Sequence, residues 1–401
     1  MTTVEKTKQA EIKGFDFRFV NISALIIKVT NKCNLDCKYC YEDVSKQGDT
    51  LPIETFKTIA QKAITSSVND KITFIFHGGE PTLIPIEWYS EAVAFCNYLG
   101  SVFSKTIHFG LQTNLISVTD NKLLELKKLG ISISASIDAH NDIHTPERNF
   151  SKKAIQNFYR AKALNISVNV LSTINKSNYN SFGQFIDFLK SNFVVNSFKA
   201  NVAYPVGFGK FAEQLSPEEI FQAKKDILSK MIFEKGQGVN EVNTLKQIQK
   251  YFNPTDSCEN TLCDKQTCGA GKSVLGFNHK GDILPCGRFA WNDTTYYLGS
   301  VYDQSNINKE DFENSISDFQ NKNPENWVDC KTCPAKAICN FGCQAFISRS
   351  NNKANIECLS TKMLHKLFEE NKVDLKIIYD NNLQRIEAGY SDGYSDYSDS
   401  R

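Results

Sequence analysis

Three cysteines close together form the part of this sequence whose chemistry is easiest to read. They lie in Cys33-Asn-Leu-Asp-Cys37-Lys-Tyr-Cys40, a C-x3-C-x2-C spacing that directly follows an apolar segment. Three thiolates in so short a loop can ligate three irons of a cubane cluster and leave the fourth iron open for an outside ligand. A zinc loop is the alternative, although zinc sites usually take their cysteines in two pairs. The spacing therefore favours an iron–sulfur loop.

Two polar motifs follow later apolar segments. The first is His77-Gly78-Gly79-Glu80-Pro81, in which paired glycines let backbone approach a ligand and Glu80 can accept from an ammonium group. The second is Ser134-Ala-Ser136-Ile-Asp138, followed by Arg148. Small hydroxyls suit ribose oxygens, and arginine suits a carboxylate. Taken alone, the first motif could be a plain strand-ending turn and the second could serve capping and surface pairing.

A second group of cysteines lies in the last third of the chain. Its spacing is Cys268-x12-Gly281-x4-Cys286, then Cys330-x2-Cys333-x5-Cys339-x3-Cys343, and finally Cys358, with Cys258 and Cys263 ahead of it. Eight ligands suffice for two four-coordinate clusters, and zinc ribbons are the alternative. Coupling with the three-cysteine loop favours iron–sulfur chemistry. Cys96, alone in an apolar run, is expected to be a buried small hydrophobe.

Composition limits the remaining function classes. The chain has 401 residues, a formal net charge of +1 and 13 cysteines. The balanced charge predicts neither a nucleic-acid nor a membrane partner, and no segment is apolar for long enough to suggest a transmembrane helix. The polar N-terminus lacks a secretory signal, so we expect a cytoplasmic protein. Disulfides are not expected there, and an odd cysteine count also argues against a disulfide framework.

The elements that must position these residues alternate between strands and helices, which predicts an α/β fold with a parallel sheet. Six βα units are too few for an eight-fold barrel and fit a partial barrel or an open curved sheet. The motifs would then share one rim, at the carboxyl ends of the strands. Other polar rim residues that could touch substrate are Gln112, Asn114, Asp138, Asn201 and Tyr204. The predicted strands are Ala24–Val29, Ile72–His77, Ile107–Thr113, Ile131–Ser136, Ser167–Thr173 and Ser197–Ala203. The predicted helices are Ile53–Ser66, Glu87–Tyr98, Asp120–Leu129, Lys152–Leu164, Asn180–Asn192, Pro217–Phe233 and Ser360–Glu370.

These patterns divide the chain into segments. We expect an N-terminal extension over 1–22, the barrel over 23–235, a linker over 236–256, a small metal-stapled domain over 257–370 and a tail over 371–401. We expect no separate leader-binding domain, since only about 20 residues precede the first predicted strand. The last part of the tail, Gly389–Arg401, is acidic, low in complexity and without aliphatic residues, so we expect it to be disordered when unbound.

With these motifs in hand, the sequence resembles the radical S-adenosylmethionine (SAM) superfamily. CNLDCKYC together with HGGEP carries the resemblance, and the late cysteines match the seven-cysteine pattern of the SPASM domain at every spacing. The resemblance implies a partial (β/α)6 radical SAM barrel followed by a small cysteine-rich SPASM domain. It also implies reductive cleavage of SAM to methionine and a 5′-deoxyadenosyl radical, with an electron donor such as flavodoxin or ferredoxin.

The resemblance also implies roles for individual residues, including three [4Fe–4S] clusters. Cys33, Cys37 and Cys40 would hold the cluster that binds SAM. Gly78, Gly79 and Glu80 would meet the SAM amine, Tyr39 would lie by the adenine, and Ser136 and Arg148 would serve the ribose and the carboxylate. One auxiliary cluster would be held by Cys263, Cys268, Cys286 and Cys343, with Cys258 the alternative to Cys263. The other would be held by Cys330, Cys333, Cys339 and Cys358.

Enzymes with a SPASM domain mostly modify peptides or proteins, so the resemblance points to a maturase acting on a ribosomally made precursor peptide. A sulfatase-maturing enzyme is a rival, but the proposed base of that group is an Asp directly after the hairpin cysteine, and Gly287 stands there. A non-catalytic zinc-binding scaffold is the alternative from another class.

The tail suggests a finer hypothesis about the substrate. It contains three Tyr-Ser-Asp units: Tyr390-Ser-Asp392, Tyr394-Ser-Asp396 and Tyr397-Ser-Asp399. Some peptide maturases of this family join an aromatic ring to the β-carbon of a residue two places on, which gives a three-residue cyclophane. The tail could therefore be a substrate-like core, or simply a solvated acidic tail.

Overall fold

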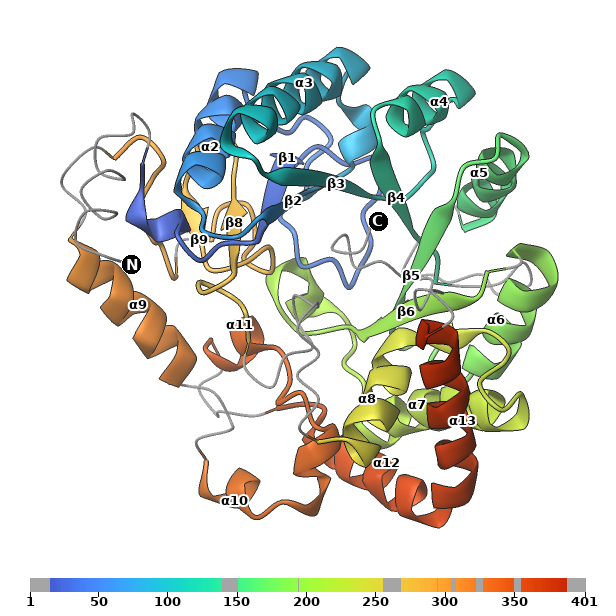
Figure 1. Ribbon diagram of the computed structural model, residues 1–401. Helices are drawn as coiled ribbons and strands as arrows, with labels where there is room; N and C mark the ends of the chain where they lie inside the picture. Colours follow the sequence, from blue (N-terminus) through green and yellow to red (C-terminus); the bar gives the residue numbers. More distant parts are fainter. Residues whose placement is uncertain are drawn as a thin grey trace.

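The computed structural model describes residues 15–138, 151–193, 195–254, 268–293, 295–303, 308–321, 327–349 and 355–387. Within these ranges the strands form one sheet in the order β7-β6-β5-β4-β3-β2-β1-β8-β9. Neighbouring strands are parallel except β8 and β9, which are antiparallel. The strands β1 to β6 curve into an arc with their helices on the outside (Figure 1). The predicted α/β partial barrel is therefore confirmed.

The six central strands lie within one residue of the predicted bounds at each end. The strands are β1 (Ala24–Thr30), β2 (Lys71–Gly78), β3 (Thr106–Thr113), β4 (Ile131–Ser136), β5 (Val168–Ile174) and β6 (Ser197–Val202). The helices that follow them are α2 (Ile53–Ser66), α3 (Ile86–Phe103), α4 (Asp120–Lys128), α5 (Ser151–Ala163), α6 (Phe182–Phe188), which continues as a π-turn over Leu189–Phe193, and α7 (Pro217–Phe233). None of the helices in the described ranges is long and apolar enough to cross a membrane.

Local sequence explains these elements. β1 reads ALIIKVT and is buried along nearly its whole length, as expected of a parallel strand covered on both faces. Aromatic rings join the sheet to its helices: Phe56 of α2 lies 5.8 Å from Phe74 and 5.1 Å from Trp88 between ring centroids. α7 begins at Pro217 because Ser216 and Glu219 form a capping box. Cys96 is fully buried on α3, as predicted.

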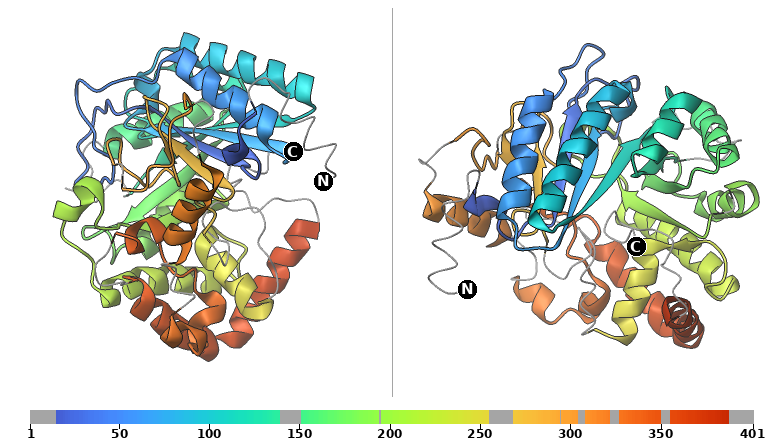
Figure 2. Two further views of the ribbon diagram at one scale, coloured as in Figure 1. Left: turned by 90° about the vertical axis from the view of Figure 1, so that its left-hand side faces the viewer. Right: turned by 45° about the horizontal axis from the view of Figure 1, so that its top comes forward.

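The later part of the chain extends the barrel sheet on both sides, which the sequence did not indicate. β7 (Asn240–Glu241) pairs with β6, and β8 (Val274–Phe277) pairs with β1 and leads into β9 (Ile283–Leu284). The segment predicted as a linker holds β7 and the helix α8 (Val242–Phe252). Helices α12 and α13 pack against α7 and α8 (Figure 2). The remaining helices are α9 (Lys309–Asn321), α10 (Val328–Lys331), α11 (Gln344–Ile347), α12 (Cys358–Glu370) and α13 (Lys372–Glu387).

Candidate functional site

The loop that follows β1 brings the three cysteines of the first motif together. The backbone N–H of Cys33 donates to Ser45 O at 2.9 Å, and that of Cys40 donates to Cys37 O at 3.0 Å. Burial, together with the neighbouring Cys37 thiol, raises the pKa of the Cys40 thiol to about 12. Ionised thiolates here need a positive partner, which a bound metal cluster supplies.

The cysteines of the described chain are thiols and not disulfides. Within the same ranges, no three or more His, Cys, Asp or Glu side chains converge closely enough to hold one metal ion. The thiolates of a cubane bind different iron atoms, so they need not converge on one point. The cysteine groups therefore lack the tight arrangement of a single-ion site.

The two glycines at the end of β2 let the cysteine loop approach this strand. Gly78 has φ +116°, and a Cβ there would lie 2.3 Å from Thr30 O. A Cβ on Gly79 would lie 2.3 Å from Lys32 O. With no side chain at either glycine, the two segments lie close enough for backbone hydrogen bonds. The N–H of Gly79 donates to Thr30 O at 2.7 Å, and the N–H of Glu80 donates to Lys32 O at 2.8 Å. The sequence analysis expected these glycines to let the backbone approach a ligand. At both Cβ positions, the close neighbour is instead the loop that carries Cys33.

Glu80 is buried and tied to its own chain. Its Oε1 accepts from Thr82 N at 2.9 Å, from Thr82 Oγ1 at 2.5 Å and from Thr113 Oγ1 at 2.7 Å. Its Oε2 accepts from Asn114 N at 2.7 Å. A carboxylate oxygen offers about two lone pairs, so Oε2 keeps the remaining acceptor capacity. Glu80 thus joins the ends of β2 and β3.

The end of β3 also holds the cysteine loop. Asn114 Nδ2 donates to Asn34 Oδ1 at 2.7 Å, and Asn34 Nδ2 donates to Ser117 Oγ at 2.6 Å. Asn34 directly follows Cys33. The chain Glu80–Asn114–Asn34 therefore positions the first cysteine from two strand ends.

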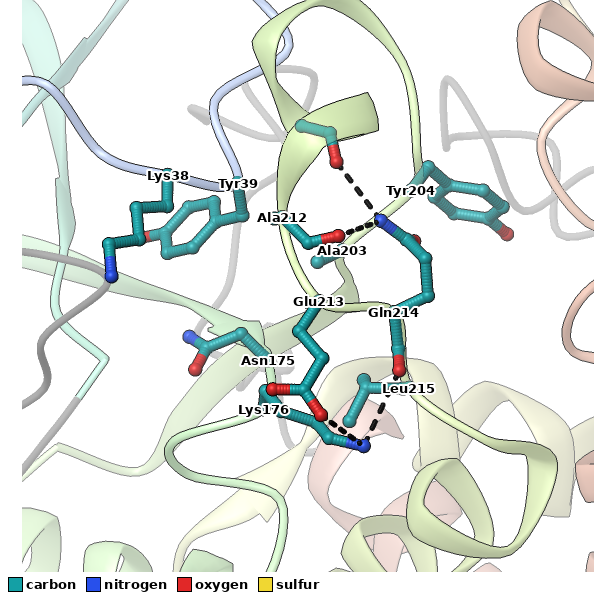
Figure 3. Close-up of a pocket in the computed structure, with 11 residues that line it drawn as sticks. Lys38, Tyr39, Asn175, Lys176, Ala203, Tyr204, Ala212, Glu213, Gln214 and Leu215 are labelled. Carbon is teal, nitrogen blue, oxygen red and sulfur yellow. Dashed lines mark hydrogen bonds and ion pairs between the residues drawn. The ribbon is translucent and has the colours of Figure 1, made fainter.

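A cavity of about 190 Å³ opens beside the loop, at the ends of β5 and β6 (Figure 3). Lys38 and Tyr39 line it from the loop side, and Asn175 and Tyr204 line it from the strand ends. Lys176 lies on its wall and forms an ion pair with Glu213 at 3.3 Å. The polar wall suits a polar ligand.

Four further predicted residues, Tyr39, Gln112, Ser136 and Asp138, lie on the same rim. The Tyr39 hydroxyl hydrogen bonds to Asp138, whose Oδ1 accepts from Thr173 N at 2.8 Å. Ser136 Oγ accepts from Gln112 Nε2 at 2.8 Å. These contacts bring the ends of β3, β4 and β5 to the cysteine loop. Arg148 lies outside the described residues.

The barrel interior holds charged groups that sequence reasoning missed. Lys28 of β1 and Glu42 form a fully buried ion pair at 2.6 Å. Burial raises the pKa of Glu42 more than Lys28 lowers it. His77 lies nearby, and burial, with the charges of Lys28 and Arg288, lowers its pKa to about 3. Since Nδ1 of His77 accepts from Gly78 N at 2.7 Å, the ring is neutral.

Four of the late cysteines surround one cavity. Its volume is about 310 Å³, and it is lined by the thiols predicted for one auxiliary cluster, namely Cys330, Cys333, Cys339 and Cys358. Burial is the main cause that raises the pKa of Cys339 to about 11. These four residues come from three short elements, α10, the turn after it and the start of α12.

Three other late cysteines pack against a separate cluster of apolar residues. Cys268, Cys286 and Cys343 pack against buried residues that include Phe289 and Phe319. The backbone N–H of Arg288 donates to Cys286 Sγ at 3.4 Å. The fourth ligand predicted for this group, Cys263, and its alternative Cys258 lie outside the described residues.

Two signals could have identified the missed residues. Lys28 is the charged residue within an otherwise apolar strand, and a buried lysine requires a partner. Arg288 and Glu357 are each close in sequence to a cysteine, at Cys286 and Cys358. The guanidinium of Arg288 lies 5.0 Å from the ring centroid of Tyr41 and 6.0 Å from that of Tyr204, and the Tyr204 hydroxyl donates to Glu357. These contacts could not be predicted, because the residues come from distant parts of the chain.

The chain is similar to proteins of known family. The family model of the radical SAM superfamily matches residues 27–189. A cysteine-type anaerobic sulfatase-maturating enzyme of Clostridium novyi is 25% identical over 88% of this chain and 95% of its own.

Two solved structures share the fold. Native anSMEcpe with bound AdoMet and Cp18Cys peptide has a TM-score of 0.74 at 20% identity, covering 89% of this chain and 99% of its own. Streptococcus suis SuiB bound to precursor peptide SuiA has a TM-score of 0.54 at 17% identity, covering 87% and 76%. The matched family model covers the three-cysteine loop and its glycine support, so residues 27–189 of this chain form a radical SAM domain.

Proposed function

We propose that this chain is a peptide maturase in which Cys33, Cys37 and Cys40 hold a [4Fe–4S] cluster that binds SAM. The observation that carries the proposal is the presence of a second group of four cysteines around one cavity, in addition to the three-cysteine loop at the barrel rim. Three thiols on one loop, held from two strand ends, fit a cluster with one open iron. The chemistry supplied there is reductive cleavage of SAM, which yields a 5′-deoxyadenosyl radical that takes a hydrogen atom from substrate.

The protein's own residues bind and orient SAM in this proposal. Gly78 and Gly79 keep the cysteine loop against β2, and Glu80 offers Oε2 to the SAM amine while its Oε1 stays with Thr82 and Thr113. Tyr39 lines the rim cavity, which suits the adenosine end of SAM. Ser136 and Arg148 are assigned to the ribose and the carboxylate.

We assign two auxiliary [4Fe–4S] clusters to the late cysteines. Cys330, Cys333, Cys339 and Cys358 fit one cluster because their side chains line a single cavity. Cys268, Cys286 and Cys343, with Cys263, are assigned to the other. An outside one-electron donor, such as flavodoxin or ferredoxin, would reduce the SAM-binding cluster.

A peptide substrate is supported by the relatives. The two solved structures described above contain a bound peptide and a bound precursor peptide. The finer proposal is that the Tyr-Ser-Asp units of the tail, which lies outside the described residues, are such a substrate. One hydrogen atom would leave the Asp β-carbon to the deoxyadenosyl radical, and the β-carbon would bond to the Tyr ring. The ring would then lose a proton, and its surplus electron would pass to an auxiliary cluster, so that each unit loses two hydrogens.

A sulfatase-maturing activity is the second candidate, because the relative from Clostridium novyi bears that name. The proposed base of that group would have to stand at Gly287. A Cβ built on Gly287 lies 2.5 Å from Ile26 Cγ2, so an aspartate fits this position only if the Ile26 side chain moves. This contact disfavours the second candidate.

Mass spectrometry after an anaerobic reaction tests the proposal. The full chain, reconstituted with iron and sulfide, is incubated with SAM and dithionite. We expect 5′-deoxyadenosine and a loss of two hydrogens per modified Tyr-Ser-Asp unit. A protein that binds only zinc and forms no 5′-deoxyadenosine would overturn the proposal in favour of the scaffold.

Two controls test SAM cleavage and the identity of the substrate separately. The triple variant Cys33→Ser, Cys37→Ser, Cys40→Ser should keep the auxiliary iron and form no 5′-deoxyadenosine. 5′-Deoxyadenosine formed with an unchanged tail mass would refute the tail as substrate and leave the maturase to act on another peptide.

A further inference from the structure

A short turn over Pro81–Leu83 directly follows Glu80 at the end of β2. Thr82 of this turn donates two hydrogen bonds to Glu80 Oε1, at 2.9 Å from its backbone N–H and at 2.5 Å from its hydroxyl. The direction in which the Glu80 carboxylate points therefore depends on where the turn lies.

Two helices hold this turn through its carbonyl oxygens. From α4, the ammonium of Lys122 donates to Thr82 O at 2.5 Å and also to Ile84 O. From α3, the buried hydroxyl of Tyr89 donates to Pro81 O at 2.8 Å. Lys122 is the charged member of this set, and hydrogen bonds from a charged donor are the stronger ones.

The place of Lys122 in α4 is unfavourable for a lysine. α4 begins at Asp120, so Lys122 lies in the first turn, where the helix dipole disfavours a positive charge. The side chain is also half-buried, and burial lowers the pKa of Lys122, although the charges of Glu80 and Glu87 oppose this effect. A lysine in such a position needs contacts that offset both costs, and the two carbonyl oxygens of the turn provide them.

The contacts of Lys122 leave Glu80 available to a ligand. Among the described residues, Lys122 forms no ion pair, and its ammonium donates to backbone carbonyl oxygens rather than to the nearby Glu80 carboxylate. Glu80 Oε2 accepts from Asn114 N at 2.7 Å and keeps capacity for a further donor. Lys122 thus fixes the segment around Glu80 without occupying the oxygen that an amine would use.

We propose that Lys122 is a positioning residue for SAM: it holds the turn after Glu80 and so aims Glu80 Oε2 at the SAM amine. This inference rests on the proposed function and deepens it, because it assigns part of the affinity for the amine to a residue of α4. Lys122 does not touch SAM in this arrangement and acts through Glu80. Its loss should weaken recognition of the amine and leave the cluster loop loaded with iron.

Binding of two ligands to the reconstituted full chain tests the inference without turnover. The probes are SAM and the SAM analogue that lacks the amino group, measured by anaerobic equilibrium dialysis with no reductant present. The parent protein should bind SAM about tenfold or more tightly than the analogue. In Lys122→Met this ratio should fall about fivefold at unchanged iron content, because the turn no longer holds Glu80 in place.

Three further variants separate positioning from a general loss of structure. Lys127→Met is the matched control, because Lys127 also lies on α4 and donates to a carbonyl, Asn165 O at 2.9 Å, and its loss should leave the ratio unchanged. Lys122→Gln can still donate to one carbonyl, so its ratio should fall less, and it serves as the test if Lys122→Met loses iron. Glu80→Gln should lower the ratio by itself, and adding Lys122→Met to it should lower the ratio no further.

Several outcomes would overturn the inference. They are a parent-like ratio in an iron-loaded Lys122 variant, equal losses of affinity for SAM and for the analogue, or an equal fall of the ratio in Lys127→Met. A further fall when Lys122→Met is added to Glu80→Gln would also overturn it, because Lys122 would then act independently of Glu80. The proposed function fails separately, through absence of 5′-deoxyadenosine in the parent protein or an unchanged ratio in Glu80→Gln.

Discussion

Replacing Gly79 with alanine would place a methyl carbon 2.3 Å from Lys32 O and 2.8 Å from Lys32 C. Both atoms are backbone, so no side-chain rotation relieves the contact. The cysteine loop and the end of β2 must move apart. That movement breaks the hydrogen bonds from Gly79 N to Thr30 O, at 2.7 Å, and from Glu80 N to Lys32 O, at 2.8 Å.

The cost follows from these two bonds. A buried backbone group that loses its partner costs about 1–3 kcal/mol, so two bonds cost about 2–6 kcal/mol. Gly130 provides the matched control, because it has φ +71° and no atom within 4 Å of an added Cβ. Gly130→Ala should cost only the strain of a left-handed residue, about 1–2 kcal/mol. Gly79→Ala should therefore be the more damaging change.

Iron content, electron paramagnetic resonance and thermal unfolding under anaerobic conditions measure both variants. For Gly79→Ala we expect about one four-iron cluster fewer per chain, with the auxiliary clusters retained, because the loop of Cys33 is displaced. For Gly130→Ala we expect full iron content and a modest fall in the unfolding temperature. Full iron and normal SAM cleavage in Gly79→Ala would refute the reasoning that the glycine holds the loop in place.

Three other predictions concern buried charges and cluster ligands. Lys28→Met should lose about 3–5 kcal/mol in urea unfolding, because Glu42 stays buried without its cation, and adding Glu42→Gln should recover most of it; equal stability of the two variants would contradict this. The pKa of His77 in the folded protein, about 3, lies below its ordinary value of 6.5, so the stability that the neutral ring contributes is complete above pH 6.5 and is lost as the pH falls below it. Between pH 7 and pH 5 the parent should lose about 1–2 kcal/mol more than His77→Gln, and parallel losses would contradict this. Cys263→Ser should lower iron content by about one cluster and Cys258→Ser should not; the reverse result would exchange their roles.

The sequence alone determined the features that depend on neighbouring residues. The three cysteines of the first motif share one short loop, so their spacing predicted a common site before any fold was known. The six strands of the barrel were also predictable, because parallel strands covered on both faces read as short apolar runs. The helix predicted over Pro217–Phe233 has the bounds of α7.

Only the tertiary structure decided the contacts between distant segments. It showed that Gly78 and Gly79 support the cysteine loop, that β8 extends the sheet beside β1, and that Arg288 meets Tyr41 and Tyr204. The sequence pattern could not reveal these contacts, because packing joins residues that no local periodicity relates. Spacing along the chain thus determined which residues can do the chemistry, and packing of the sheet and its late strands decided what surrounds them.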